Sequence, residues 1–193
     1  RAAVSAQAAR LADQGLRVLG VAKAQHPTGH DWPGIQHDFA LQWLGLVGLA
    51  DPLRPEVPQA IAQCHTAGIR VVMITGDHPR TAAAIAAQAG IPQHEVVTGD
   101  VLAAMTPQAL ADKVAQACVF ARIKPHQKLA LVEALKAQGE VVAMTGDGVN
   151  DAPALKAAHI GIAMGQRGTD VAREAAALVL LEDDFTAIVQ AIR

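Results

Sequence analysis

Short apolar stretches alternate with amphipathic stretches along most of the chain, from about residue 41 to the carboxyl end. The apolar stretches have the length of buried strands, and the amphipathic ones repeat apolar residues at helical spacing. Alternation of this kind is typical of a doubly wound parallel α/β sheet, which is the fold class that we predict. The predicted strands are 41–50, 69–74, 95–97, 117–121, 140–144, 160–164 and 178–181, and the predicted helices are 56–67, 79–89, 107–115, 125–138, 151–158, 168–176 and a last one from Phe185.

Glycine and proline mark the boundaries of several predicted helices. Proline is favoured in the first helical turn and glycine just past the last one. The prolines at predicted starts are Pro79, Pro107 and Pro125, and the glycines at predicted ends are Gly68, Gly90 and Gly139. The two patterns agree on where the helices lie.

The first 40 residues have a different pattern. Val4, Ala8 and Leu11 predict a helix over 2–14, and alternation over 16–22 predicts a strand. The segment 25–38 is rich in proline, glycine and histidine, which indicates a loop. Its histidines have no regular ligand spacing, so they do not favour a metal site.

Composition narrows the class of protein. Hydrophobic residues make up 51% of the chain and aromatic residues only 3%, so we expect a core of Ala, Val, Leu and Ile. Such a core is typical of proteins in which helices pack on both faces of a parallel sheet. The net charge of −2 gives no electrostatic case for a nucleic-acid partner. Cys64 and Cys118 are far apart in sequence and predict buried thiols in a reducing compartment. No apolar run reaches the length of a membrane span, and the start at Arg1 within a helical pattern predicts a piece of a larger protein.

The run Met-Thr-Gly-Asp-Gly-Val-Asn-Asp at 144–151 carries the densest chemistry of the chain. It follows the predicted strand 140–144, so Asp147, Asn150 and Asp151 lie at the carboxyl end of a strand, where parallel sheets bind ligands. Magnesium prefers hard oxygen ligands and usually shares them with substrate phosphates. The run therefore predicts a magnesium–phosphate site.

A shorter run of the same kind, Thr75-Gly76-Asp77, follows the predicted strand 69–74. Two such strand ends predict one phosphate pocket that is lined from both sides. The alternative is ordinary turn chemistry with a helix N-cap, because Asp bonds its own backbone and glycine accepts positive φ. For the shorter run both interpretations stay open, whereas a plain turn does not need the two carboxylates, the asparagine and the two glycines of the longer run.

The motifs resemble, in sequence and in order, those of the phosphorylation domain of P-type cation-transporting ATPases, which belongs to the haloacid dehalogenase superfamily. The resemblance extends from about residue 41 to the end, and residues 1–40 resemble the last helix and strand of the nucleotide-binding domain that these pumps insert. It implies a nucleotide-domain remnant over 1–40 and a phosphorylation domain over 41–193. The motifs are Asp-Pro-Leu-Arg at 51–54, Met-Ile-Thr-Gly-Asp at 73–77, Val-Phe-Ala-Arg at 119–122 with Lys128, the run 144–151, and a tail at 161–176 that looks like the calcium-pump branch.

The resemblance implies roles at the metal and the transferred phosphoryl group. Asp147 would bind Mg²⁺ directly, and Asp151 would support the same site without direct contact to the metal. Asn150 and Lys128 would contact the phosphoryl group, and a fixed cation stabilises the charge on its oxygens. The alternative for Lys128 is a solvated lysine on the helix that begins at Pro125.

The resemblance also implies contacts to ATP. Thr75 and the Gly76 amide would bind a phosphate oxygen, and Asp77 would meet the ribose or the phosphate side of the nucleotide. Arg122 resembles a nucleotide-contacting arginine, and Arg17 resembles one at the tip of the nucleotide domain. The expected cofactors are therefore Mg²⁺ and ATP.

Asp51 and Arg54 would join the hinge to this site, although Arg54 equally suits an ordinary ion pair. The nucleophile of these pumps is the aspartate of an Asp-Lys-Thr-Gly-Thr sequence, which does not occur in this chain. Without it there is no covalent route, and we expect the 193-residue chain neither to autophosphorylate nor to hydrolyse ATP at a meaningful rate. The missing strand would be the central one, between the strands that end at Thr75 and Thr145. Two unpaired edges and an apolar slot would remain, which favours self-association.

The leading hypothesis is the cytoplasmic catalytic region of an ATP-driven, multi-pass membrane pump for an inorganic cation, whose membrane and actuator domains would be its partners. A soluble phosphatase of the same superfamily is the first alternative, although it needs its own nucleophile near its amino terminus. A non-catalytic nucleotide-binding module is the second.

Overall fold

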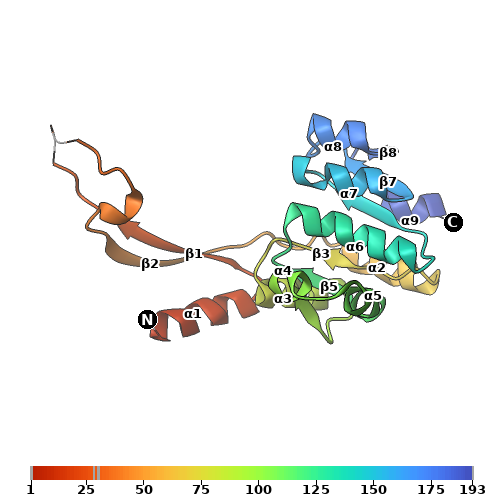
Figure 1. Cartoon of the computed structure of the whole chain (residues 1–193), viewed down its shortest axis with the longest axis horizontal. Helices are drawn as coiled ribbons and strands as arrows, with labels where there is room; N and C mark the ends of the chain where they lie inside the picture. Colours follow the sequence, from red (N-terminus) through yellow and green to blue (C-terminus); the bar gives the residue numbers. More distant parts are fainter. Residues whose placement is uncertain (1, 28, 30, 193) are drawn as a thin grey trace.

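The computed structural model describes residues 2–27, 29 and 31–192, so Arg1 and the loop histidine His30 lie outside the described residues (Figure 1). A two-stranded ribbon and one helix at the amino end project from a larger α/β body. The helices are α1 (Ala2–Asp13), α2 (Val57–Thr66), α3 (Pro79–Ala89), α4 (Gly99–Ala103), α5 (Pro107–Gln116), α6 (Pro125–Ala137), α7 (Ala152–Ala157), α8 (Asp170–Ala175) and α9 (Thr186–Ile192), with 3₁₀ turns η1 (Gln36–Asp38) and η2 (Val149–Asp151). The strands are β1 (Arg17–Lys23), β2 (Gln42–Leu49), β3 (Met73–Ile74), β4 (Val96–Thr98), β5 (Val119–Ala121), β6 (Ala143–Gly146), β7 (Ile160–Met164) and β8 (Leu178–Leu180).

The α/β body contains two separate parallel half-sheets. One has the strand order β3-β5-β4 and the other β6-β7-β8, and every pairing within them is parallel. The predicted parallel α/β class is therefore confirmed. The half-sheets are not hydrogen-bonded to each other, so β3 and β6 each have one strand neighbour among the described residues.

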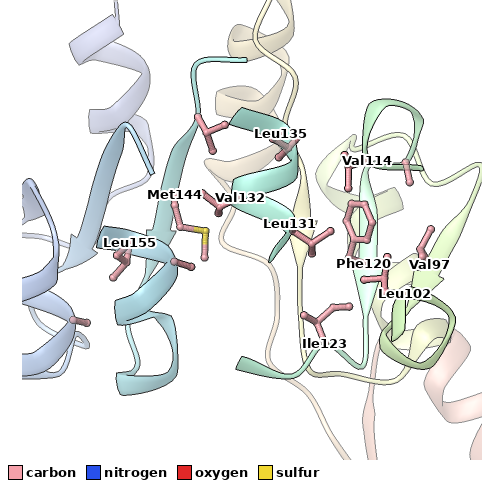
Figure 2. Packing of buried hydrophobic residues seen from close by; sticks show 14 of the residues in the cluster. Val97, Leu102, Val114, Phe120, Ile123, Leu131, Val132, Leu135, Met144 and Leu155 are labelled. Carbon is pink, nitrogen blue, oxygen red and sulfur yellow. The ribbon is translucent and has the colours of Figure 1, made fainter. Parts of the chain in front are cut away.

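Helix α6 holds the two half-sheets together. Its Leu131 and Val132 are each 1% exposed and belong to one apolar cluster with residues of both half-sheets. Figure 2 shows these side chains between Phe120 of β5 and Met144 of β6. Continuous packing over one face thus bridges two sheets that share no hydrogen bonds.

The prolines and glycines that predicted the helix boundaries lie at or next to the ends of the observed helices. Pro79, Pro107 and Pro125 are the first residues of α3, α5 and α6. Gly90 follows α3 with φ +79°, a left-handed conformation that glycine adopts without steric cost. Thr106 caps α5 by accepting a hydrogen bond from the Ala109 N–H at 3.2 Å.

Most predicted strands differ from the observed ones by one or two residues, and two of them begin three or four residues later than predicted. The strand predicted over 69–74 is reduced to Met73–Ile74, because β3 has a partner on one side only and residues 71–72 have none. The strand predicted over 140–144 begins later, at Ala143. The short helix α4 at 99–103 was not predicted.

The strands β1 and β2 form an antiparallel ribbon with a register shift between Val21 and Ala22. The strand predicted over 41–50 was therefore wrongly grouped with the parallel strands, because β2 pairs with β1 and belongs to neither half-sheet. The ribbon is apolar yet exposed: the exposed fraction is 50% for Trp43 and 55% for Leu44, because no further layer covers two strands alone. The proposed domain boundary, between residues 40 and 41, lies in the loop that joins β1 to β2. The division into domains stays a prediction.

The two cysteines are buried and free, as predicted. Cys64 is 3% exposed and Cys118 is 9% exposed. Burial raises the pKa of the Cys64 thiol, which makes the reactive thiolate rarer still.

Candidate functional site

The loops after β3 and β6 face each other across a cavity of about 970 Å³ between the two half-sheets. Asp77 reaches it from the β3 side, and Thr145 and Asp147 reach it from the β6 side. Both strands are parallel to their neighbours and end at this cavity, so their polar residues come together at one edge. The arrangement has the form of the predicted pocket that is lined from both sides.

Asp151 connects the run 144–151 to α6. Its carboxylate lies 2.5 Å from the Lys128 Nζ, and the exposed fractions of these two side chains are 8% and 19%. The other carboxylate oxygen accepts hydrogen bonds from the N–H groups of Asp147 at 3.3 Å and Gly148 at 3.1 Å. Gly146 permits this approach, since a Cβ there would lie 2.6 Å from the Asp151 Cβ. Asp151 therefore shapes the loop that presents Asp147.

Asp147 itself has an exposed side chain with no partner among the described residues. Its backbone is fixed, because its carbonyl accepts a hydrogen bond from the Thr169 N–H at 2.8 Å. No group of three or more His, Cys, Asp or Glu side chains is arranged for a metal within the part of the chain that the structure describes. The donor set still fits Mg²⁺, which proteins bind through one or two carboxylates plus water and substrate phosphates.

The loop at 75–77 is held in place by its own hydrogen bonds and by the β5 loop. The Thr75 hydroxyl donates to the Asp77 carboxylate at 3.2 Å and accepts from the Asp77 N–H at 3.1 Å. The Arg122 N–H donates to the Asp77 carbonyl at 3.1 Å, and Arg122 has φ +55°. This backbone conformation is rare for a residue with a side chain and is frequent at functional sites.

A second cavity of about 620 Å³ lies between the ribbon, α1 and the start of α3. Four residues expected to contact the nucleotide, Arg17, Gly76, Asp77 and Arg122, all line it, and Arg17 and Asp77 line the first cavity as well. Arg80 also lines this cavity, although sequence reasoning did not select it. With Arg17, Arg80 and Arg122 among its lining residues, the cavity suits a polyphosphate ligand.

Arg80 lies at the second cavity because it bonds to α1. Its guanidinium makes two hydrogen bonds of 2.9 Å to the Asp13 carboxylate, and both side chains are about half exposed. No sequence pattern connects residues so far apart in the chain.

The other candidate residues occupy different positions. Asn150 is exposed within η2 beside Asp151 and lines neither cavity. Asp51 and Arg54 line the first cavity, but Arg54 donates to the Asp183 carbonyl at 2.5 Å rather than to a carboxylate. Thr75 lines neither cavity.

Asp183 is a buried residue of the site region that sequence reasoning missed. It is 4% exposed, has φ +52°, and its carboxylate accepts hydrogen bonds of 3.0 Å from the N–H groups of Gln166 and Arg167. It thereby fixes the loop between β7 and α8, from which Arg167 reaches the first cavity.

The carboxylate of Asp183 is expected to make the fold sensitive to acid. Burial alone would raise the pKa of Asp183, but the N–H groups of Gln166 and Arg167 and the Arg54 charge outweigh it and lower the pKa. Hydrogen bonds from Thr186 lower the pKa of Asp184 as well. A lowered pKa means that the stabilisation is complete above the unfolded value, about 4, and is lost as the pH falls below it. We expect the urea midpoint to fall between pH 5 and pH 3, the pH range about this value.

The variant Asp183→Asn is the test of this expectation. It should lower the urea midpoint at pH 7 and flatten its decline below pH 5, since asparagine cannot accept both N–H bonds as a charged group. Asp100→Asn, at an exposed position in α4, is the matched control and should leave the profile unchanged. Equal acid profiles for Asp183→Asn and the unchanged chain would contradict the assignment.

Within the described residues, no helix is both long and apolar enough to cross a membrane.

Comparison with known proteins places this chain in a family. A family model described as haloacid dehalogenase-like hydrolase matches residues 6–159. The cation-transporting ATPase pma1 of Synechocystis is 52% identical over 188 residues, which are 94% of this chain and 21% of the relative. The calcium-transporting ATPase 1 of Yarrowia lipolytica is 47% identical over 100% of the chain, and the calcium-transporting ATPase of Bacillus subtilis is 47% identical over 95% of it. The chain spans about a fifth of the length of these relatives, 21% in each case.

Proposed function

The chain belongs to the haloacid dehalogenase-like hydrolases, and on that premise we propose that it is the Mg²⁺- and ATP-binding part of a P-type cation pump. In this role it binds the metal and the phosphates while an aspartyl-phosphate is formed and hydrolysed. The resemblance to cation-transporting ATPases that the motifs predicted is confirmed by relatives that match nearly the whole chain. One observation of the structure carries the proposal: Asp77 and Asp147, at the ends of β3 and β6, line a single cavity.

The metal would bind at Asp147. Its carboxylate is exposed and unpaired within the described part of the chain, while its backbone is fixed by Thr169. Asp151 is paired with Lys128 and with two N–H groups, so it supports the loop rather than offering a free oxygen pair. Bound Mg²⁺ would neutralise negative charge on the phosphate oxygens.

The transferred phosphoryl group would meet Lys128 and Asn150. Lys128 is held near the carboxyl end of β6 by Asp151, and Asn150 lies on the adjacent turn. A lysine placed beforehand needs little reorganisation when charge develops on the phosphoryl oxygens. On the opposite side, the Thr75 hydroxyl and the Gly76 amide would bind a phosphate oxygen.

The nucleotide would occupy the second cavity. Arg17 and Arg122 would bind its phosphates, and Asp77 would accept from the ribose or lie beside the phosphates. Because Arg17 and Asp77 line both cavities, a nucleotide held in the second cavity would direct its terminal phosphate to the first.

The covalent step needs a nucleophilic carboxylate, and the motif that carries it in these pumps is absent from this chain. The sequence contains no Asp-Lys-Thr-Gly-Thr. In the proposal, a strand of the longer protein supplies it, and the 193-residue chain alone is inactive in ATP hydrolysis. That longer protein would be a multi-pass membrane pump for an inorganic cation, with this region on the cytoplasmic side and membrane and actuator domains as its partners.

Binding of ATP to the chain tests the proposal. Arg122→Gln is expected to weaken the binding of Mg²⁺–ATP about 10- to 100-fold, because one charge-assisted hydrogen bond is lost. Arg122 already has a positive φ. Glutamine has a Cβ, as arginine does, so the substitution does not change the backbone strain at this position. Isothermal titration calorimetry measures the affinity, with circular dichroism to verify the fold.

Arg10→Gln is the matched control, since Arg10 is exposed on α1 and does not line the cavity. Its affinity for ATP should equal that of the unchanged chain. The nucleotide assignment fails if Arg122→Gln and Arg10→Gln bind ATP equally, or if the folded chain does not bind ATP.

A further inference from the structure

We propose that Arg80 binds a phosphate of the ligand in the second cavity, and that Asp13 of α1 competes with this phosphate for the same guanidinium group. The inference rests on the proposed function for the identity of the ligand as a nucleotide. The phosphate contact itself follows from the residues of the cavity and from the weakness of the ion pair between Arg80 and Asp13.

Arg80 is placed at the cavity by the start of α3. It is the second residue of this helix, which begins at Pro79, and its N–H donates to the His78 Nδ1 at 3.3 Å. Arg80 and His78 both line the second cavity. Because the backbone of Arg80 is fixed in the first helical turn, only its side chain has to move when it changes partner.

Asp13 holds the Arg80 side chain from outside the cavity. The Arg80 Nη1 donates to both oxygens of the Asp13 carboxylate at 2.9 Å, whereas Asp13 does not line the cavity. Helix α1 ends at Asp13 and lies beside α3 (Figure 1). The Arg80 side chain therefore joins a residue of the cavity lining to an acid outside it.

The ion pair between Arg80 and Asp13 is weak enough to be exchanged. The exposed fractions of the two side chains are 54% and 50%, so water screens their attraction. A single nitrogen serves both carboxylate oxygens, without the two parallel bonds of a bidentate pair. A triphosphate carries several negative charges on adjacent oxygens, so it attracts a guanidinium group more strongly than one exposed carboxylate does.

The charges of the second cavity favour a phosphate as the new partner. Arg17 and Arg122 line the cavity together with Arg80, and Asp77 is the one acid among the described residues that line it. The Asp77 carboxylate already accepts a hydrogen bond from the Thr75 hydroxyl at 3.2 Å. Three arginines at one cavity match the several charged oxygens of a triphosphate.

Helix α1 does not need the ion pair to stay in place. The Thr81 hydroxyl donates to the Leu16 carbonyl at 3.1 Å. Gly15 packs closely on α3, since a Cβ at this glycine would lie 3.3 Å from the Ile85 side chain. Release of Asp13 therefore leaves the wall of the cavity intact, and the variant Asp13→Asn is expected to fold.

Isothermal titration calorimetry of charge variants tests the inference, with Mg²⁺–ATP and inorganic tripolyphosphate as the two ligands. Asp13→Asn is expected to strengthen the binding of both ligands about two- to fivefold, because an exposed ion pair of ordinary strength no longer competes. Arg80→Gln should weaken both about tenfold, since a half-exposed charge-assisted hydrogen bond is lost. In the Arg80→Gln background, Asp13→Asn should have no effect.

Asp100→Asn is the matched control for charge, since this exposed acid of α4 lines neither cavity and should leave both affinities unchanged. Circular dichroism verifies the fold of each variant. Equal gains in Asp13→Asn and Asp100→Asn would reduce the effect to net charge and overturn the inference. If Arg80→Gln does not fold, this comparison decides.

Three further results would overturn the inference. The first is unchanged or weaker binding in Asp13→Asn, because the ion pair then only shapes the cavity. The second is unchanged binding in a folded Arg80→Gln. The third is a gain from Asp13→Asn that persists in the Arg80→Gln background, since Arg80 then does not mediate it.

The two ligands separate this inference from the proposed function. If ATP binds and Arg122→Gln weakens its binding while Asp13→Asn has no effect, the inference fails and the proposed function stands. If tripolyphosphate shows the expected order of affinities but ATP does not bind, the nucleotide assignment fails and the phosphate contact of Arg80 stands. Failure of both ligands to bind the folded chain overturns both.

Discussion

Asp147→Asn, made in the longer protein of which this chain is proposed to be a part, is expected to lower the rate of phosphoenzyme formation from ATP at least about 100-fold. A metal at a phosphoryl-transfer site contributes several kcal/mol to the transition state, and each 1.36 kcal/mol is about tenfold in rate. Asparagine retains one oxygen but removes the charge that holds Mg²⁺. The rate is measured by rapid quench with labelled ATP at saturating Mg²⁺.

The same substitution separates function from stability. Because the Asp147 side chain is exposed and has no partner within the described residues, Asp147→Asn should change the free energy of unfolding by no more than about 0.5 kcal/mol. Asp100→Asn, an exposed acid in α4, should leave both the rate and the stability unchanged. Normal phosphoenzyme formation in Asp147→Asn would remove Asp147 from the metal site.

Lys128→Ala is expected to destabilise the 193-residue chain by about 3 kcal/mol. The substitution leaves the Asp151 carboxylate, only 8% exposed, without its cation at 2.5 Å. Removing one partner of a largely buried ion pair costs more than the pair contributes, since the remaining charge stays desolvated. Urea denaturation followed by circular dichroism measures the loss.

Lys156→Ala is the control for this prediction, because Lys156 is exposed on α7 and should cost less than about 0.5 kcal/mol. The double variant Lys128→Ala with Asp151→Asn should lose at least about 1 kcal/mol less than the sum of the two single losses. Additive losses would show that the ion pair does not hold the run 144–151 to α6.

Most of the α/β body could be predicted from local sequence. Pro79, Pro107 and Pro125 fix where three helices begin, because proline needs no N–H partner in the first turn. The strand at β3 could not be predicted correctly, because its length depends on a neighbour that the chain does not place beside it. The exposure of Trp43 and Leu44 could not be predicted either, since an apolar strand pattern does not show whether another layer covers the strand.

The positions of the candidate carboxylates could be predicted from the sequence, whereas the contacts that hold them in place could not. The run 144–151 indicated carboxylates at a strand end, and the structure places Asp147 there. The pairing of Lys128 with Asp151 and the support that Asp183 gives to the loop before α8 depend on contacts between distant segments. No local spacing encodes such contacts, so only the folded chain shows them.

Identifying the residue that is phosphorylated in the longer protein tests the proposed function most directly. After reaction with labelled Mg²⁺–ATP and acid quench, peptide mapping by mass spectrometry should locate the phosphate on one aspartate outside residues 1–193, and the 193-residue chain alone should carry none. A phosphate on any carboxylate within residues 1–193, or Mg²⁺-dependent ATP hydrolysis by the isolated chain that is lost in Asp147→Ala, would contradict it.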